Sequence, residues 1–167
     1  MPYANPYPEM MRRGVARRQD VMGTDIFTKE ILEEVIPFIE KNYRVRPDAG
    51  SRAIAGFSLG GRQSLACGLG NPDTFHYVCA FAPAVFGDEV STNFDNGIYA
   101  KPSVISSRLK LMWLCCGTSD FLYQASLVLH QSLQERGIEH KTMFPGGGHT
   151  WMNCRDYITE VAQHLFK

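Results

Sequence analysis

A serine flanked by glycines lies between a short apolar run and a segment with helical character. The motif Gly56-Phe57-Ser58-Leu59-Gly60 overlaps the end of the run Ala53–Phe57. This spacing between a strand and a helix is typical of a nucleophile elbow, a strained turn that exposes the serine hydroxyl. Glycine is expected at 56 and 60 because the tight crossing leaves no room for side chains. The motif predicts Ser58 as a nucleophile and the Leu59 backbone N–H as an oxyanion donor.

A serine hydroxyl is a poor nucleophile until a base removes its proton, and His149 is the candidate base. His149 follows the glycines 146–148, which give the backbone the freedom to carry the imidazole over the edge of a sheet. It would take the proton of Ser58 and later return it to the leaving alcohol. Asp120 would hold the imidazole in the correct tautomer and stabilise its charged form. These three residues form a predicted catalytic triad.

Simpler explanations remain open for the members of this triad. Asp120 is also a suitable N-cap for the helix expected after it, and His149 could be an ordinary loop histidine. Asp88 is an alternative acid because it follows the second apolar run. Cys115 and Cys116 are weaker alternative nucleophiles, because both lie within an apolar run and not on a turn.

Strands and helices alternate along the chain that must position these residues. Apolar runs predict strands at 53–57, 77–81, 109–116 and 139–144, and helical periodicity predicts helices at 25–43, 62–68, 121–136 and at the C-terminus. The alternation indicates an α/β fold with a mostly parallel sheet and flanking helices. Sites in such sheets form at the carboxyl ends of the strands. Ser58, Asp120 and His149 each follow a strand, so we expect them to meet at one edge.

Three local features complete this expectation. Pro37 should kink the helix over 25–43 without ending it. Residues 83–108 combine glycine, proline, asparagine and serine with isolated aromatics, and predict a long loop that acts as a lid or pocket wall. The last helix is expected to bury Cys154, Tyr157, Ile158, Val161, Ala162 and Leu165.

Composition limits the classes of partner. The 167 residues suit a single domain over 1–167, and 17 basic side chains balance 17 acidic ones. Because the charges balance, we expect no net electrostatic attraction to nucleic acid or to an anionic membrane. No apolar run is long enough to span a bilayer. No cysteine or histidine spacing resembles a metal site, so neither metal nor cofactor is expected. Buried free thiols are predicted at all five cysteines: Cys67, Cys79, Cys115, Cys116 and Cys154.

The first 23 residues are rich in proline, tyrosine and arginine, and predict a long loop. A basic cluster there is interpreted as a solvated face, with contact to an anion or acidic sugar as the alternative; its members are Arg12, Arg13, Arg17 and Arg18. No signal-peptide pattern is present at the N-terminus. Free cysteines favour a reducing interior.

Four segments, in this order and over nearly the whole chain, carry a resemblance to a known family. They are 36–45 (IPFIEKNYRV), 53–61 (AIAGFSLGG), 116–122 (CGTSDFL) and 147–151 (GGHTW). With them the chain resembles the esterase family of α/β-hydrolases that includes bacterial feruloyl (cinnamoyl) esterases and related acetyl esterases. The resemblance implies Ser58 as nucleophile, Asp120 as acid and His149 as base. The chain order of serine, acid and histidine is also that of α/β-hydrolases.

The resemblance further implies that the chain holds only the second half of an eight-stranded fold. Residues 1–3 look like the end of the family's fourth strand. The segment that supplies the second oxyanion donor is then absent, which typically costs about a hundred- to a thousandfold in rate. The strand 53–57 would also lack a neighbour, and its open edge predicts aggregation or a homo-oligomer.

The expected function is that of a serine carboxylesterase acting through an acyl-enzyme. The resemblance implies hydroxycinnamoyl or acetyl esters of plant cell-wall sugars as substrates, and proteins that are often exported. Two alternatives stay open: a truncated module that binds carbohydrate or a partner chain with little or no catalysis, and a peptidase or thioesterase using the same triad. Candidate walls for an aromatic acyl group are Phe86, Phe94, Tyr99 and Trp151.

Overall fold

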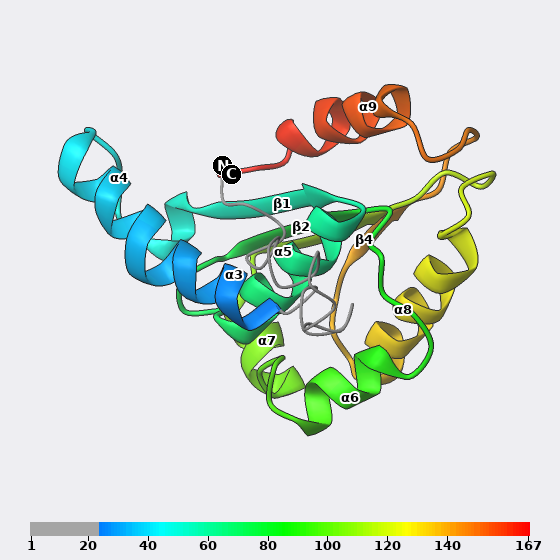
Figure 1. Cartoon of the computed structure of the whole chain (residues 1–167), viewed down its shortest axis with the longest axis horizontal. Coiled ribbons are helices and arrows are strands. Elements are labelled where there is room, and N and C mark those ends of the chain that lie inside the picture. Colours follow the sequence, from blue (N-terminus) through cyan, green and yellow to red (C-terminus); the bar gives the residue numbers. More distant parts are fainter. Residues whose placement is uncertain (1–23) are drawn as a thin grey trace, which may run out of the picture. The chain divides into compact units, whose positions relative to one another are not determined.

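The computed structural model describes residues 24–167 (Figure 1). By its internal contacts the chain divides into two compact units, Met1–Pro47 and Asp48–Lys167. The loop and the arginine cluster expected within residues 1–23 lie outside the described residues, as does the strand end expected at 1–3. Within the described range, no helix is both long and apolar enough to cross a membrane.

The described part of the first unit begins with one continuous helical segment, which ends at Asn42. It consists of α3 (Thr24–Glu30), the π-helical turn η1 (Ile31–Val35) and α4 (Ile36–Asn42). The N–H of Ile36 donates to the carbonyl of Ile31, five residues back, in the manner of a π turn. Pro37 cannot donate a hydrogen bond, and its ring crowds the carbonyl four residues earlier. The structure thus has a π turn directly before Pro37, where the sequence predicted a kink, and the helix continues beyond Pro37 as predicted.

The second unit is built on a four-stranded parallel sheet in the order β1-β2-β3-β4. Its strands are β1 (Ala53–Phe57), β2 (Tyr77–Phe81), β3 (Leu111–Cys115) and β4 (Lys141–Met143). Phe57 pairs with Phe81, Phe81 with Cys115, and Cys115 with Met143. The carboxyl ends of the strands are therefore in register. All four predicted strands are confirmed, with β3 and β4 shorter than expected.

Helices cover both faces of this sheet. They are α5 (Leu59–Gly70), α6 (Glu89–Asp95), α7 (Pro102–Arg108), α8 (Tyr123–Glu135) and α9 (Trp151–Ala162), with a short 3-10 turn η2 (Ala49–Ser51) before β1. In Figure 1, α9 lies on one side of the sheet, and α5, α6, α7 and α8 lie on the other. The prediction of one long loop over 83–108 is wrong, because α6 and α7 lie within it.

Alternate side chains of the strands face the two helical layers. One core cluster joins the strands to α9 and contains Cys79, Phe81, Trp113, Cys115, Cys154, Tyr157 and Val161. On the opposite face, α5 approaches so closely that a Cβ at Gly68 would press on Val78 and Ile54. All five cysteines are free and buried, as predicted.

The buried stripe of α9 is narrower than its sequence pattern indicated. Cys154, Tyr157 and Val161 are buried, as predicted, but Ile158 is 52% exposed. Ala162 is exposed as well. Because α9 packs on the sheet with a single stripe, residues at its flank remain in solvent. The prediction that Ile158 and Ala162 are core residues is therefore wrong.

The segment after β2 is tied to the helices beside it. Arg62 of α5 forms an ion pair with Glu89 of α6 at 2.7 Å, and both side chains are largely buried. Arg136, the C-cap of α8, donates a hydrogen bond to Ser91 at 3.1 Å and lies over the ring of Phe94. These contacts position α6 at the carboxyl side of the sheet.

Candidate active site

Ser58 occupies a strained turn between β1 and α5. Its backbone has φ +60° and ψ −119°, a combination that residues with a Cβ rarely adopt. The N–H of Ser58 donates to Phe81 at 2.8 Å, and its carbonyl accepts from Arg62 and Ala84, each at 3.1 Å. Three backbone hydrogen bonds thus hold the turn in a conformation that would otherwise relax. Leu59 is the first residue of α5, where N–H groups have no partner within the helix.

The glycines around the turn have different roles. A Cβ at Gly56 would collide with the backbone carbonyl of Gly60. A Cβ at Gly61 would lie 3.0 Å from the Cα of Pro83. At Gly60, by contrast, such a Cβ would meet no atom of the described residues within 4 Å, apart from its chain neighbours and the backbone of its own helix. The expectation that Gly60 is needed for lack of space is wrong, because its carbonyl, and not its Cα hydrogen, faces β1; Gly61 is the second constrained glycine.

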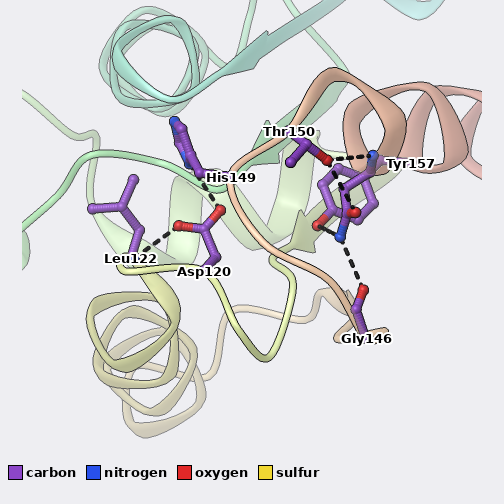
Figure 2. Close-up of polar contacts among 7 residues, drawn as sticks. Asp120, Leu122, Gly146, His149, Thr150 and Tyr157 are labelled. Carbon is purple, nitrogen blue, oxygen red and sulfur yellow. Dashed lines mark hydrogen bonds and ion pairs between the residues drawn. The ribbon is translucent and has the colours of Figure 1, made fainter.

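Asp120 follows β3 and divides its two carboxylate oxygens between two tasks. Its side chain is fully buried. Oδ1 accepts the N–H of Leu122 at 2.9 Å, beside the start of α8. Oδ2 lies 2.8 Å from Nδ1 of His149 (Figure 2). The N-cap of α8 is Leu122, so the alternative that Asp120 is itself the N-cap is wrong. Asp120 instead accepts the N–H of that N-cap residue with one oxygen and contacts the histidine with the other.

His149 follows β4 and lies among aromatic rings. Its ring centroid is 4.4 Å from that of Phe57 and 4.7 Å from that of Phe121. Because Nδ1 faces a buried carboxylate, the proton belongs on Nδ1 and Nε2 remains an acceptor, as a general base requires. Phe57 directly precedes Ser58, so the imidazole lies beside the elbow. In residues 24–167, no hydrogen bond joins Ser58 to His149 directly.

The alternative residues occupy other places. Asp88 is exposed at the start of α6, whereas the carboxylate that contacts His149 belongs to Asp120. Cys115 and Cys116 are fully buried. Burial raises the pKa of Cys116 to about 11 and raises the pKa of Cys115 further. Both thiols therefore stay neutral near neutral pH, where a neutral thiol is a weak nucleophile.

The candidate substrate walls separate into three groups. Trp151 is 77% exposed, and its ring lies 5.5 Å from that of Phe57, close to His149. Phe94 and Tyr99 pack edge to face at 5.1 Å, and Tyr99 is fully buried, so it offers no exposed surface to a ligand. Phe86 is exposed ahead of α6.

Sequence reasoning missed three residues that contact or support this cluster. Phe57 and Phe121 are the chain neighbours of Ser58 and Asp120. This position beside two predicted catalytic residues could have identified them as part of the site. Asn153 hydrogen-bonds the loop that carries His149, at Gly146. Its position in the first turn of α9 indicates only a helix terminus, so no sequence signal separated it from an ordinary polar residue.

Comparison with known proteins agrees with this architecture. The pattern that defines the Esterase family, described as "Putative esterase", matches residues 3–164. A curated endo-1,4-beta-xylanase/feruloyl esterase of Xylanibacter ruminicola is 24% identical over 143 residues, which cover 84% of this chain and 18% of the relative. The CE1 ferulic acid esterase of the anaerobic fungus Anaeromyces mucronatus superimposes with a TM-score of 0.73 at 26% identity.

That superposition covers 90% of this chain and 57% of the fungal enzyme. The feruloyl esterase module of Clostridium thermocellum shares the fold with a TM-score of 0.68 at 17% identity, covering 86% of this chain and 59% of the module. The chain thus spans little more than half of these structures and less than a fifth of the curated relative. Since the family pattern extends over nearly all of the sequence, the chain belongs to the esterase family and has a partial α/β-hydrolase fold.

Proposed function

We propose that this chain acts as a serine carboxylesterase through a triad of Ser58, His149 and Asp120. The observation that carries the proposal is the 2.8 Å contact between Asp120 Oδ2 and His149 Nδ1, beside a serine with φ +60°. A buried carboxylate on one ring nitrogen leaves the other nitrogen as a base. A serine held on a strained turn exposes its hydroxyl to that base.

The proposed reaction has two steps. The hydroxyl of Ser58 attacks the ester carbonyl carbon while Nε2 of His149 accepts the proton, and the oxyanion receives a hydrogen bond from the Leu59 N–H. Collapse of this intermediate breaks the ester bond, and His149 returns the proton to the leaving alcohol. Water, deprotonated by His149, then attacks the acyl carbon. The bond to Oγ of Ser58 breaks, His149 returns the proton to Oγ, and the acid is released. Asp120 stabilises the imidazolium in both steps.

We propose aromatic acyl esters, with hydroxycinnamoyl esters of plant polysaccharides as the first class to test and acetyl esters as the second. The relatives of this chain include enzymes named as feruloyl and ferulic acid esterases. In this chain, Trp151 and Phe121 are 77% and 75% exposed. The ring of Phe121 contacts the imidazole of His149, and the ring of Trp151 contacts Phe57, which stacks on the same imidazole. Exposed rings of this kind offer a flat apolar surface to a phenolic acyl group.

The test is hydrolysis of methyl ferulate, p-nitrophenyl acetate and an acyl thioester by the wild-type chain and by Ser58→Ala. We expect turnover by the wild type, fastest on the ferulate, and none above background by the variant. A fluorophosphonate probe should label the wild type at Ser58 and leave the variant unlabelled. Equal turnover by both proteins would reject the triad, and preference for the thioester would reassign the bond that is cleaved.

A further inference from the structure

The loop that carries His149 is fixed by hydrogen bonds to three consecutive carbonyl groups. The carbonyl of Pro145 accepts from the Thr118 N–H at 2.8 Å, and that of Gly147 accepts from the Ser119 N–H at 3.0 Å. Both donors belong to the loop that ends at Asp120. The carbonyl between these two, that of Gly146, accepts from Nδ2 of Asn153 at 2.9 Å. Two backbone N–H groups and one side chain of α9 thus pair with the three carbonyl groups.

The amide of Asn153 uses both of its polar atoms in this region, and its partners Gly146, Thr150 and Tyr157 are labelled in Figure 2. Nδ2 donates to Gly146 and also to the hydroxyl of Tyr157 at 3.2 Å. Oδ1 accepts from the hydroxyl of Thr150 at 3.3 Å. Only an N–H can donate to a carbonyl, so the contact with Gly146 fixes the orientation of the amide. Because Tyr157 is fully buried, the amide is anchored to the core of the unit.

Two glycines leave the space that this amide occupies. Gly147 has φ +95°, and a Cβ there would collide with Oδ1 of Asn153. A Cβ at Gly117, after β3, would lie 2.7 Å from Nδ2 of Asn153 and would collide with the carbonyl of Gly147. The loops that carry the predicted acid and base therefore meet directly, with the Asn153 amide against both. Larger residues at 117 or 147 would separate them.

We propose that Asn153 is a positioning residue of the site, which holds the His149 loop so that the imidazole stays against Asp120. This inference rests on the proposed function. Within residues 24–167, Asn153 forms no hydrogen bond with either ring nitrogen of His149. It acts through the carbonyl of Gly146, three residues before His149. Without the amide, the loop keeps its two backbone hydrogen bonds to the acid loop and loses the side-chain hydrogen bond from α9 to the carbonyl of Gly146.

The discriminating variant is Asn153→Asp, which keeps the shape and Oδ1 but replaces the donating nitrogen with an oxygen. That oxygen would face the carbonyl of Gly146 and repel it. Displacement of a catalytic group by about 1 Å can cost roughly a hundredfold in rate, so we expect kcat to fall about 10- to 100-fold with KM unchanged. The proton between Nδ1 of His149 and Asp120, observed as a far-downfield resonance by NMR, should broaden or disappear. That resonance is assigned by its absence from His149→Ala.

The matched control is Val161→Ala, on the buried face of the same helix and 2% exposed. It should lower the melting temperature through lost packing while leaving kcat and the downfield resonance of the folded protein unchanged. Wild-type kcat and a wild-type resonance in Asn153→Asp would overturn the proposal. A change in melting temperature alone, as in Val161→Ala, would overturn it equally.

Two further measurements keep the outcome decisive. If Asn153→Asp does not fold, Asn153→Ala, which introduces no charge, is assayed in the same way. If Ser58→Ala turns over ester as fast as the wild type, the proposed function fails. The resonance does not depend on turnover, so it still shows whether Asn153 holds His149 against Asp120.

Discussion

The ring of Phe57 stacks on the imidazole of His149, with centroids 4.4 Å apart and planes inclined by 27°. Phe57 is the last residue of β1 and the neighbour of Ser58. The strand that leads into the proposed nucleophile therefore also supports the proposed base. Phe121, the neighbour of Asp120, contacts the same imidazole at 4.7 Å. Each proposed partner of His149 thus brings an adjacent aromatic ring to it.

Replacement of Phe57 by leucine should impair catalysis more than binding. Leucine retains apolar bulk but loses the stacked ring, and an aromatic pair is worth about 0.5–1.5 kcal/mol beyond its buried area. If that free energy orients the imidazole, kcat should fall about 2- to 12-fold in Phe57→Leu. Steady-state kinetics with p-nitrophenyl acetate would measure this fall. Because that acyl group is small, an effect confined to KM would contradict the positioning role.

The two oxygens of Asp120 predict different outcomes for two substitutions. In Asp120→Asn, the amide oxygen can still accept from Leu122, while the NH₂ group faces Nδ1 of His149 and forces the proton onto Nε2. We expect kcat to fall about 10⁴-fold with little change in stability. Asp120→Ala should lose the same activity and also leave the Leu122 N–H unpaired, at about 1–3 kcal/mol. Urea unfolding, measured together with kinetics, would distinguish the two variants. Equal stability of both would contradict a stabilising role for the hydrogen bond between Oδ1 and the Leu122 N–H.

The two motif glycines should respond in opposite ways to alanine. A methyl group at Gly56 collides with the carbonyl of Gly60, a backbone atom that cannot move aside, so Gly56→Ala should destabilise the chain by at least about 1–3 kcal/mol. Gly60 lies within α5 with open space at its Cα. Gly60→Ala should therefore be neutral or stabilise by up to about 1 kcal/mol. Urea midpoints would measure both, and similar losses in the two variants would contradict this difference.

The elements beside the site were predictable where local sequence alone decides them. The strands at 53–57 and 77–81 are short apolar runs bounded by turn residues, and the structure has the same limits. Asp120 and His149 could be paired in advance because parallel strands bring their carboxyl ends to one edge. The continuation of the helix beyond Pro37 was predicted from its periodicity, whereas the π turn before Pro37 was not.

Other features depend on contacts that no local pattern contains. The helix α6 has only seven residues, too few to be stable alone, and ion pairing between Arg62 and Glu89 ties it to α5. The role of Asn153 depends on a carbonyl seven residues earlier in the chain. The motif spacing predicted the turn at Ser58, but it did not indicate that a Cβ would collide at Gly56 and not at Gly60.

The buried thiols and phenols predict a loss of stability at alkaline pH. Burial raises the pKa of Cys79 to about 12, of Cys116 to about 11 and of Tyr99 to about 12. In the unfolded chain the thiols ionise near pH 8.5 and the phenol near pH 10. Below about pH 8.5 these groups are neutral in both the folded and the unfolded state. Their contribution to the free energy of unfolding is therefore fully present there. Above it the unfolded chain releases protons first, and stability falls until the pH passes the folded pKa values.

Each such group should contribute a slope of up to about 1.4 kcal/mol per pH unit between its unfolded and folded pKa values. We therefore expect the free energy of unfolding in urea to be level near pH 7–8 and to fall steadily from about pH 9. Cys79→Ala should lower stability at pH 7, because it leaves a cavity, and should also reduce the slope above pH 9, because one ionising group is gone. An unchanged slope in Cys79→Ala would show that the Cys79 thiol does not hold its proton more tightly in the folded state.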